Sequence, residues 1–109
     1  MSIESHLKAA VTPIVPEFRA ARYNGSSENY CTYNATEIPE SFGDNEPHAI
    51  RYMIQLHWFY PLRFNPNATK RDLRRAILAA DFTAPTVEDA SDADGGHLVF
   101  EFEGIDGEV

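Results

Sequence analysis

The longest apolar and aromatic run of this sequence is Tyr52-Met53-Ile54-Gln55-Leu56-His57-Trp58-Phe59-Tyr60, which follows the turn signal Phe42-Gly43-Asp44-Asn45. From residue 49 to residue 60 the side chains alternate between two sets, which is the period of a β-strand. One set is apolar or aromatic: Ile50, Tyr52, Ile54, Leu56 and Trp58. The other set mixes polar and apolar groups: Arg51, Met53, Gln55, His57 and Phe59. The pattern predicts a central strand with one face covered by helices. The other face is partly exposed or used as an interface, where Met53 and Phe59 are candidate partner contacts.

Two segments have the spacing of amphipathic helices. The first begins after Ser2, which is placed to cap it, and Pro13 and Pro16 end it. The second can begin with Asn65 as its cap and Pro66 as its first residue, or one turn later, where Thr69 and Asp72 have the spacing of a capping box. Its buried stripe follows the i, i+3, i+4, i+7 rule: Leu73, Ala76, Ile77 and Ala80.

The remaining segments are predicted to form shorter strands and loops. Residues 17–23 form a short strand or an irregular arm, and residues 29–35 form a strand with Cys31 and Tyr33 toward the core. Pro85 makes the next strand an edge strand, and residues 89–96 form the turn before a final strand over 98–102. The loop over residues 37–47 and the turn over 89–96 are polar, so we expect both to order on assembly.

Together these elements predict an α+β fold, with an antiparallel β-sheet of about four strands and two α-helices packed on one face. The 109 residues form a single domain, with a mobile C-terminal tail from about residue 104.

The composition restricts the possible partners. Seventeen acidic and nine basic residues give a formal charge of -8, which argues against general nucleic-acid binding. The single cysteine, Cys31, excludes an internal disulfide. The N-terminal residues lack the features of a secretory signal, and no apolar run reaches the roughly 20 residues that span a membrane. We therefore expect synthesis in the cytoplasm and no membrane partner.

No group of residues has the spacing of an active site, a cofactor site or a metal site. The acidic stretch over 89–96 lacks the register of a calcium loop, so we interpret it as a solvated hairpin tip. The histidines are not spaced as metal ligands, and His57 is expected to be half-buried in a strand pair. No nucleophile signature or phosphate loop is present. The sequence predicts a protein that is not an enzyme.

One basic cluster stands out in this acidic chain: Arg63, Lys70, Arg71, Arg74 and Arg75. It is either a solvated helix face or a surface complementary to the acidic loops of another subunit. Under the second interpretation the acidic partners are Asp89, Asp92 and Asp94, and head-to-tail contacts between them and the basic cluster would build a ring.

The order of elements and three motifs resemble small tail-completion proteins of long-tailed bacteriophages and prophages. The motifs are Tyr30 to Tyr33, Phe42 to Asn45 and Tyr52 to Trp58, and the helix that ends near Phe82 also fits. The similarity extends from about Tyr23 to Phe102, and the proline-rich connection over 60–66 departs from the pattern.

The resemblance implies a tail terminator, or a related head-to-tail joining protein, in the tail-neck region of the virion after assembly in the host cytoplasm. Such a protein caps the tail tube as a ring, commonly six-fold, and contacts itself, the tail-tube protein and a neck or head-completion protein. The family has no catalytic residues. DNA would pass through the ring without specific binding, which an acidic lumen favours. The alternatives are a neck or head-completion (head-tail connector) component, or a domain that binds a small molecule or peptide.

Overall fold

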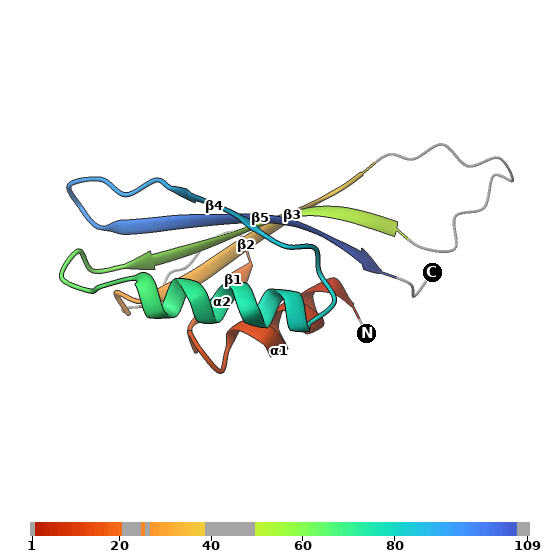
Figure 1. Cartoon of the computed structure of the whole chain (residues 1–109), viewed down its shortest axis with the longest axis horizontal. Coiled ribbons are helices and arrows are strands. Elements are labelled where there is room, and N and C mark those ends of the chain that lie inside the picture. Colours follow the sequence, from red (N-terminus) through yellow and green to blue (C-terminus); the bar gives the residue numbers. More distant parts are fainter. Residues whose placement is uncertain (1, 21–24, 26, 39–49, 107–109) are drawn as a thin grey trace, which may run out of the picture.

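The computed structural model describes residues 2–20, 25, 27–38 and 50–106. The elements in chain order are α1 (Ile3–Val11), β1 (Phe18–Ala20), β2 (Tyr30–Glu37), β3 (Ile50–Tyr60), α2 (Asn67–Ala79), β4 (Thr86–Asp89) and β5 (Gly96–Asp106). The strands form one sheet in the order β1-β2-β3-β5-β4, and both helices lie under the same face of it (Figure 1). The predicted α+β fold with two helices on one face is confirmed.

The sheet differs from the prediction in two respects: the described residues form five strands rather than about four, and their pairing is mixed rather than antiparallel. β1 pairs with β2 in parallel, through Phe18 opposite Cys31, whereas every other pair is antiparallel. Short loops between consecutive strands favour antiparallel pairing, which was the basis of the prediction. Residues 21–29 separate β1 from β2, and β1 has only three residues, so a short parallel pairing forms at the edge of the sheet.

β3 is the central strand, as predicted, because it pairs with β2 on one side and with β5 along its whole length on the other. Ile54, Leu56 and Trp58 are at most 1% exposed, and they face the helices. The Trp58 indole nitrogen donates a hydrogen bond of 2.7 Å to Asn29 Oδ1, so its polar group is satisfied.

The helices begin and end close to the predicted positions. Ser2 Oγ accepts a hydrogen bond from the Ser5 backbone N–H, which caps α1. α2 begins at Asn67, one residue after the predicted Pro66, and Asn65 Oδ1 accepts the hydrogen bond of the Asn67 N–H. No described helix is long and apolar enough to cross a membrane.

The final strand is longer than the predicted residues 98–102. β5 continues through Gly104 to Asp106, opposite Tyr52 and Ile50 of β3, so residues 104–106 belong to the sheet where a tail was expected. The Phe42 to Asn45 turn and most of the predicted 37–47 loop lie outside the described residues. The predicted turn before the final strand agrees with the end of β4 at Asp89 and the start of β5 at Gly96.

Candidate interaction surfaces

The face of the sheet opposite the helices, hereafter the open face, is covered by no described helix. Cross-strand partners share a face, so the strand register determines its members. In this register Thr32 and Val99 flank His57, while Tyr30 and His97 flank Phe59. Met53 is 38% exposed on this face, and Gln55, His57 and Phe59 are half-buried. The predicted partial exposure of this side of β3 is confirmed.

Three rings stack across neighbouring strands of the open face, and we call them the aromatic row: Tyr30, Phe59 and His97. The ring centroid of Phe59 lies 4.9 Å from that of Tyr30 and 4.1 Å from that of His97, with interplanar angles of 19° for both pairs. Offset stacking of this kind is favourable beyond the burial of area. The row is a preorganised stack of three rings at one end of the sheet, in which both faces of Phe59 are covered.

His57 and His97 form a pair that the sequence analysis did not predict. Nδ1 of His57 lies 2.9 Å from Nε2 of His97, so one ring donates a proton and the other accepts it. Burial lowers the pKa of both imidazoles. The His97 charge lowers the pKa of His57 further, whereas Asp92 and Asp89 partly oppose the lowering at His97. The pair is therefore neutral at pH 7.

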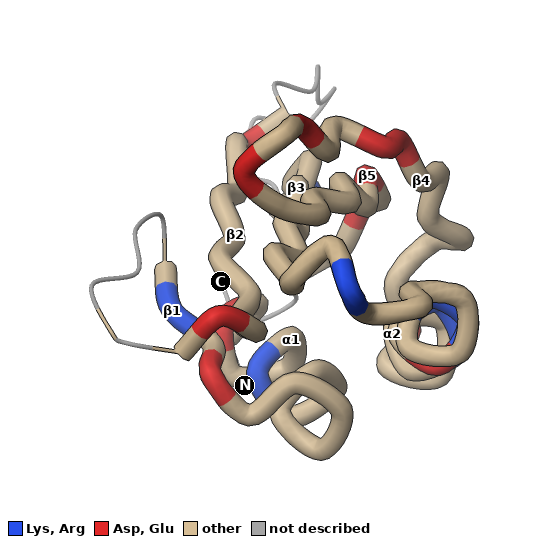
Figure 2. The backbone as a smooth tube through the Cα atoms, turned by 90° about the vertical axis from the view of Figure 1, so that its left-hand side faces the viewer, with Lys and Arg blue, Asp and Glu red and all other residues tan. Residues whose placement is uncertain are grey.

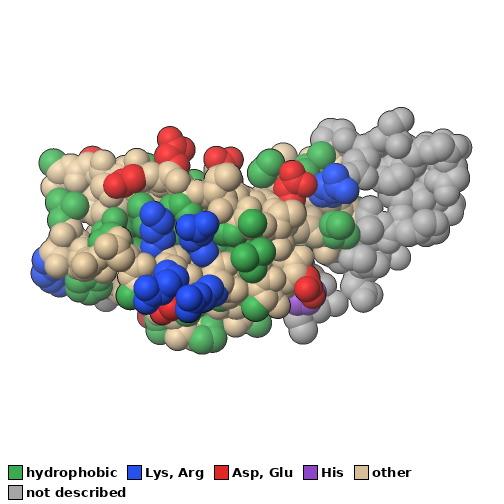
Figure 3. Space-filling model, viewed as in Figure 1, with side chains coloured by type: hydrophobic (Ala, Val, Ile, Leu, Met, Phe, Trp, Pro, Cys, Tyr) green, Lys and Arg blue, Asp and Glu red, His purple; other side chains and the backbone are tan. Residues whose placement is uncertain are grey.

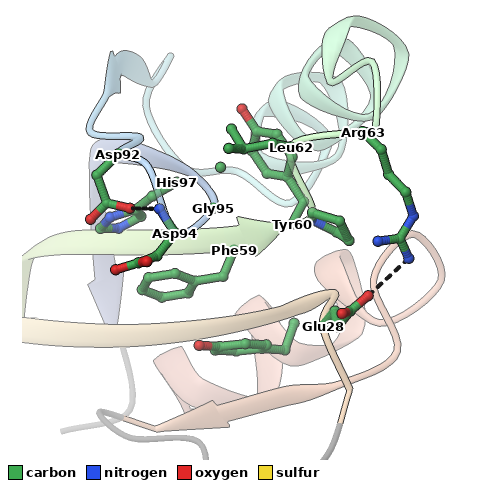
Figure 4. A pocket seen from close by; sticks show the side chains of 12 residues that line it. Glu28, Phe59, Tyr60, Leu62, Arg63, Asp92, Asp94, Gly95 and His97 are labelled. Atoms are coloured by element: carbon green, nitrogen blue, oxygen red, sulfur yellow. Dashed lines mark hydrogen bonds and ion pairs between the residues drawn. The ribbon is translucent and has the colours of Figure 1, made fainter.

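A pocket of about 480 Å³ lies at this end of the sheet, between the β4–β5 turn and the chain that leaves β3. We call it the sheet-end pocket. In Figure 4, Asp92 and Asp94 lie on one side of the Phe59 ring, and Glu28 and Arg63 lie on the other. Its lining residues are Glu28, Tyr30, Phe59, Tyr60, Pro61, Leu62, Arg63, Asp92, Asp94, Gly95, Gly96 and His97. The pocket combines an aromatic row with carboxylates at its rim.

The carboxylates of the β4–β5 turn also hold its shape. Asp92 Oδ1 accepts the Asp94 backbone N–H at 2.9 Å, and Asp89 Oδ1 accepts that of Ser91 at the same distance. Hydrogen bonds from the side chain and the backbone N–H of Ser91, aided by the charge of Lys70, lower the pKa of Asp89. Among the described residues, no group of three His, Cys, Asp or Glu side chains is arranged to hold a metal ion.

The outer side of α2 forms a second surface, which we call the arginine stripe: Arg71, Arg74 and Arg75. All three side chains are exposed, as predicted, and none forms an ion pair within the described residues. With Asn67, Lys70 and Leu78 they line a shallow groove of about 510 Å³. The basic side chains gather on one face of the molecule in Figure 3.

The structure brings only some of the predicted contact residues together. Phe59, Asp92 and Asp94 meet at the sheet-end pocket. Arg63 is separate from the arginine stripe, because it lines the pocket and forms an ion pair of 2.9 Å with Glu28. Met53 is six residues from Phe59 along β3, roughly 20 Å at the rise of a strand, so it lies outside the pocket.

Lys70 and Asp89, two of the remaining predicted contacts, lie outside both the sheet-end pocket and the arginine stripe as defined above. Lys70 is half-buried, and its charge acts on Asp89 at the end of β4. Figure 2 shows acidic residues on β4 and the following turn, and both basic and acidic residues on α2. The acidic residue of α2 is the exposed Asp72, so this helix has an excess of basic side chains but is not purely basic.

Neither a scan against protein-family models nor a search of curated proteins finds a match to this chain.

Proposed function

We propose that this chain is a structural assembly protein, a tail terminator that caps the tail tube of a long-tailed phage as a ring and joins the tail to the head. The observation that best supports this proposal is the separation of opposite charges. The arginine stripe lies on the outer side of α2, and Asp92 and Asp94 lie at the β4–β5 turn.

Two different surfaces of opposite charge favour head-to-tail association. When one surface of a subunit binds a different surface of the next, the contact is heterologous, and repeated contacts close into a ring or continue as a filament. Charge complementarity increases the rate of encounter and selects the orientation. A terminator needs the closed form, because it caps a tube of fixed symmetry.

Two of the three motifs of the resemblance lie among the described residues, on neighbouring strands. Tyr30 to Tyr33 begins β2, Tyr52 to Trp58 is the core of β3, and these two strands pair with each other. The open face beside them has half-buried aromatic rings and an exposed Met53. Such a face suits docking to the tail-tube protein or to a neck protein, since partly apolar patches mark interaction sites.

The test is to mix the purified chain with tubes assembled from the tail-tube protein of the same phage or prophage and to image them by negative stain. We expect a ring at one end of each tube and an arrest of tube growth. The matched control is the Arg71→Glu/Arg74→Glu/Arg75→Glu variant, which should leave tube ends bare. Wild-type protein that never binds tube ends would contradict the proposal, and binding to a portal or adaptor protein instead would indicate a neck component.

A further inference from the structure

We infer that the sheet-end pocket is a receptor site for an arginine side chain from α2 of a second copy of this chain. This inference rests on the proposed ring assembly and names the contact that builds it.

The lining of the pocket suits an arginine side chain. Tyr30 and His97 cover the two faces of the Phe59 ring, so the row gives the pocket an apolar wall of ring edges, on which the methylene stem of an arginine can pack. Asp92 and Asp94 stand beside the Phe59 ring (Figure 4), where their oxygens can accept hydrogen bonds from the guanidinium group. The stem and the charged end of one arginine can therefore both be accommodated.

The charge of the pocket is negative at neutral pH. Glu28 and Arg63 pair with each other at 2.9 Å, and their charges compensate. His97 is neutral, because it shares a hydrogen bond with His57 in a partly desolvated position. Asp92 and Asp94 then remain as the uncompensated charges of the lining. An anionic ligand such as a phosphate finds no uncompensated cation among the lining residues.

The arginine stripe supplies the complementary group. Its three arginines have no ion-pair partner among the described residues, although the whole chain is strongly acidic. Leu78, 52% exposed, follows Arg74 and Arg75 on the same side of α2 at i+4 and i+3. On the pocket wall Leu62 is 57% exposed. Each surface therefore offers an apolar group beside its charges.

The contact joins two copies and not two parts of one copy. No residue of α2 lines the sheet-end pocket, and the groove along the arginine stripe shares no residue with it. The pocket of one subunit thus meets the stripe of the next, which is the head-to-tail geometry of a ring.

A mixing experiment with two variants tests the inference. The stripe variant is Arg71→Glu/Arg74→Glu/Arg75→Glu, and glutamate keeps the helix propensity of α2 high. The pocket variant is Asp92→Asn/Asp94→Lys, in which the asparagine can still accept the Asp94 N–H hydrogen bond that shapes the turn. Unfolding midpoints equal to that of the wild type show that both variants are folded.

Each variant alone should form no rings under conditions in which the wild type forms them, with tail-tube protein present if the wild type needs it. An equimolar mixture should restore rings, because wild-type contacts then alternate with contacts of reversed charge. Rings in either variant alone, or no rings in the mixture, would overturn the inference but leave the terminator proposal standing. A wild-type chain that forms no rings and binds no tube end would overturn both.

A further variant examines the aromatic part of the site. Phe59→Leu should weaken self-association of the full chain about tenfold, because it removes the central ring of the aromatic row and with it both stacking contacts that hold the pocket wall. Unchanged association in Phe59→Leu would overturn the inference without relying on the charge-reversed variants.

Discussion

The two faces of the sheet receive alternate residues of the same strands, yet they differ in what surrounds them. On the helix side, Ile54, Leu56 and Trp58 have essentially no exposed area. On the open face their neighbours Met53 and Phe59 keep exposed area, and Phe59 stacks on rings of the two adjacent strands. The covered face therefore provides most of the stability of the fold, while the open face and the outer side of α2 keep exposed area, which the proposed contacts would use.

The largest expected effect is a difference in unfolding free energy between substitutions on the two faces of β3. Leu56→Ala should lower the free energy of unfolding by about 2–5 kcal/mol, because it leaves a cavity under the helices. Met53→Ala, the matched change on the open face, should cost less than about 1 kcal/mol, since surface substitutions are usually tolerated. Urea unfolding of both variants measures the difference. Equal losses would show that the open face is packed in the isolated chain.

A smaller effect is expected at a glycine where the covered face is tightly packed. A Cβ at Gly104 would lie 2.6 Å from the Phe82 ring and 3.2 Å from Ile3 Cδ1. Gly104→Ala should therefore cost about 1–3 kcal/mol, which is typical of overpacking.

The control for that change is Gly95→Ala in the β4–β5 turn, where the nearest atom to a new Cβ is the Tyr60 carbonyl oxygen at 3.5 Å. It should change the unfolding free energy by at most about 0.5 kcal/mol. Thermal unfolding of both variants provides the comparison, and a stable Gly104→Ala protein would show that Phe82 moves aside at little cost.

The smallest expected effect concerns the histidine pair of the open face. The pKa values of His57 and His97 lie below the ordinary 6.5, so the unfolded chain binds more protons between the folded-state values and about pH 6.5. Stability should fall as the pH falls through this window and should level off below the folded-state pKa values. The His57→Gln/His97→Gln variant should lose this dependence, which denaturant unfolding at several pH values can measure. A histidine NMR titration with both pKa values at or above 6.5 would be inconsistent with the buried pair.

The sequence was sufficient for features that depend on local periodicity. Alternation along β3 predicted which residues face the helices. Helical spacing predicted the burial of Leu73 and Ile77, while Ala76 and Ala80 of the same predicted stripe are only half-buried. The exposure of the arginine stripe followed from the same spacing. These features depend on residues within one element, where the period of the backbone fixes the direction of each side chain.

Features that depend on how distant segments of the chain pair could not be predicted from local periodicity. The parallel pairing of β1 and the stacking of His97 on Phe59 both follow from strand register, which no local pattern specifies. Arg63 looked like part of the basic helix because it is close in sequence, but it turns to Glu28 instead. The sheet-end pocket combines residues 28–30, 59–63 and 92–97, so it exists only after the strands have paired.

Whether the chain closes into a ring can be measured by light scattering over a wide range of concentrations, with images of any large species. The measurement is made on the chain alone and with the tail-tube protein that the proposed function requires. We expect one assembly whose mass is a fixed multiple of the monomer mass and stops growing as the concentration rises, free in solution or seated on tube ends. A chain that stays monomeric in both conditions, or grows without limit into filaments, would contradict the assignment of the arginine stripe and the sheet-end pocket to ring assembly.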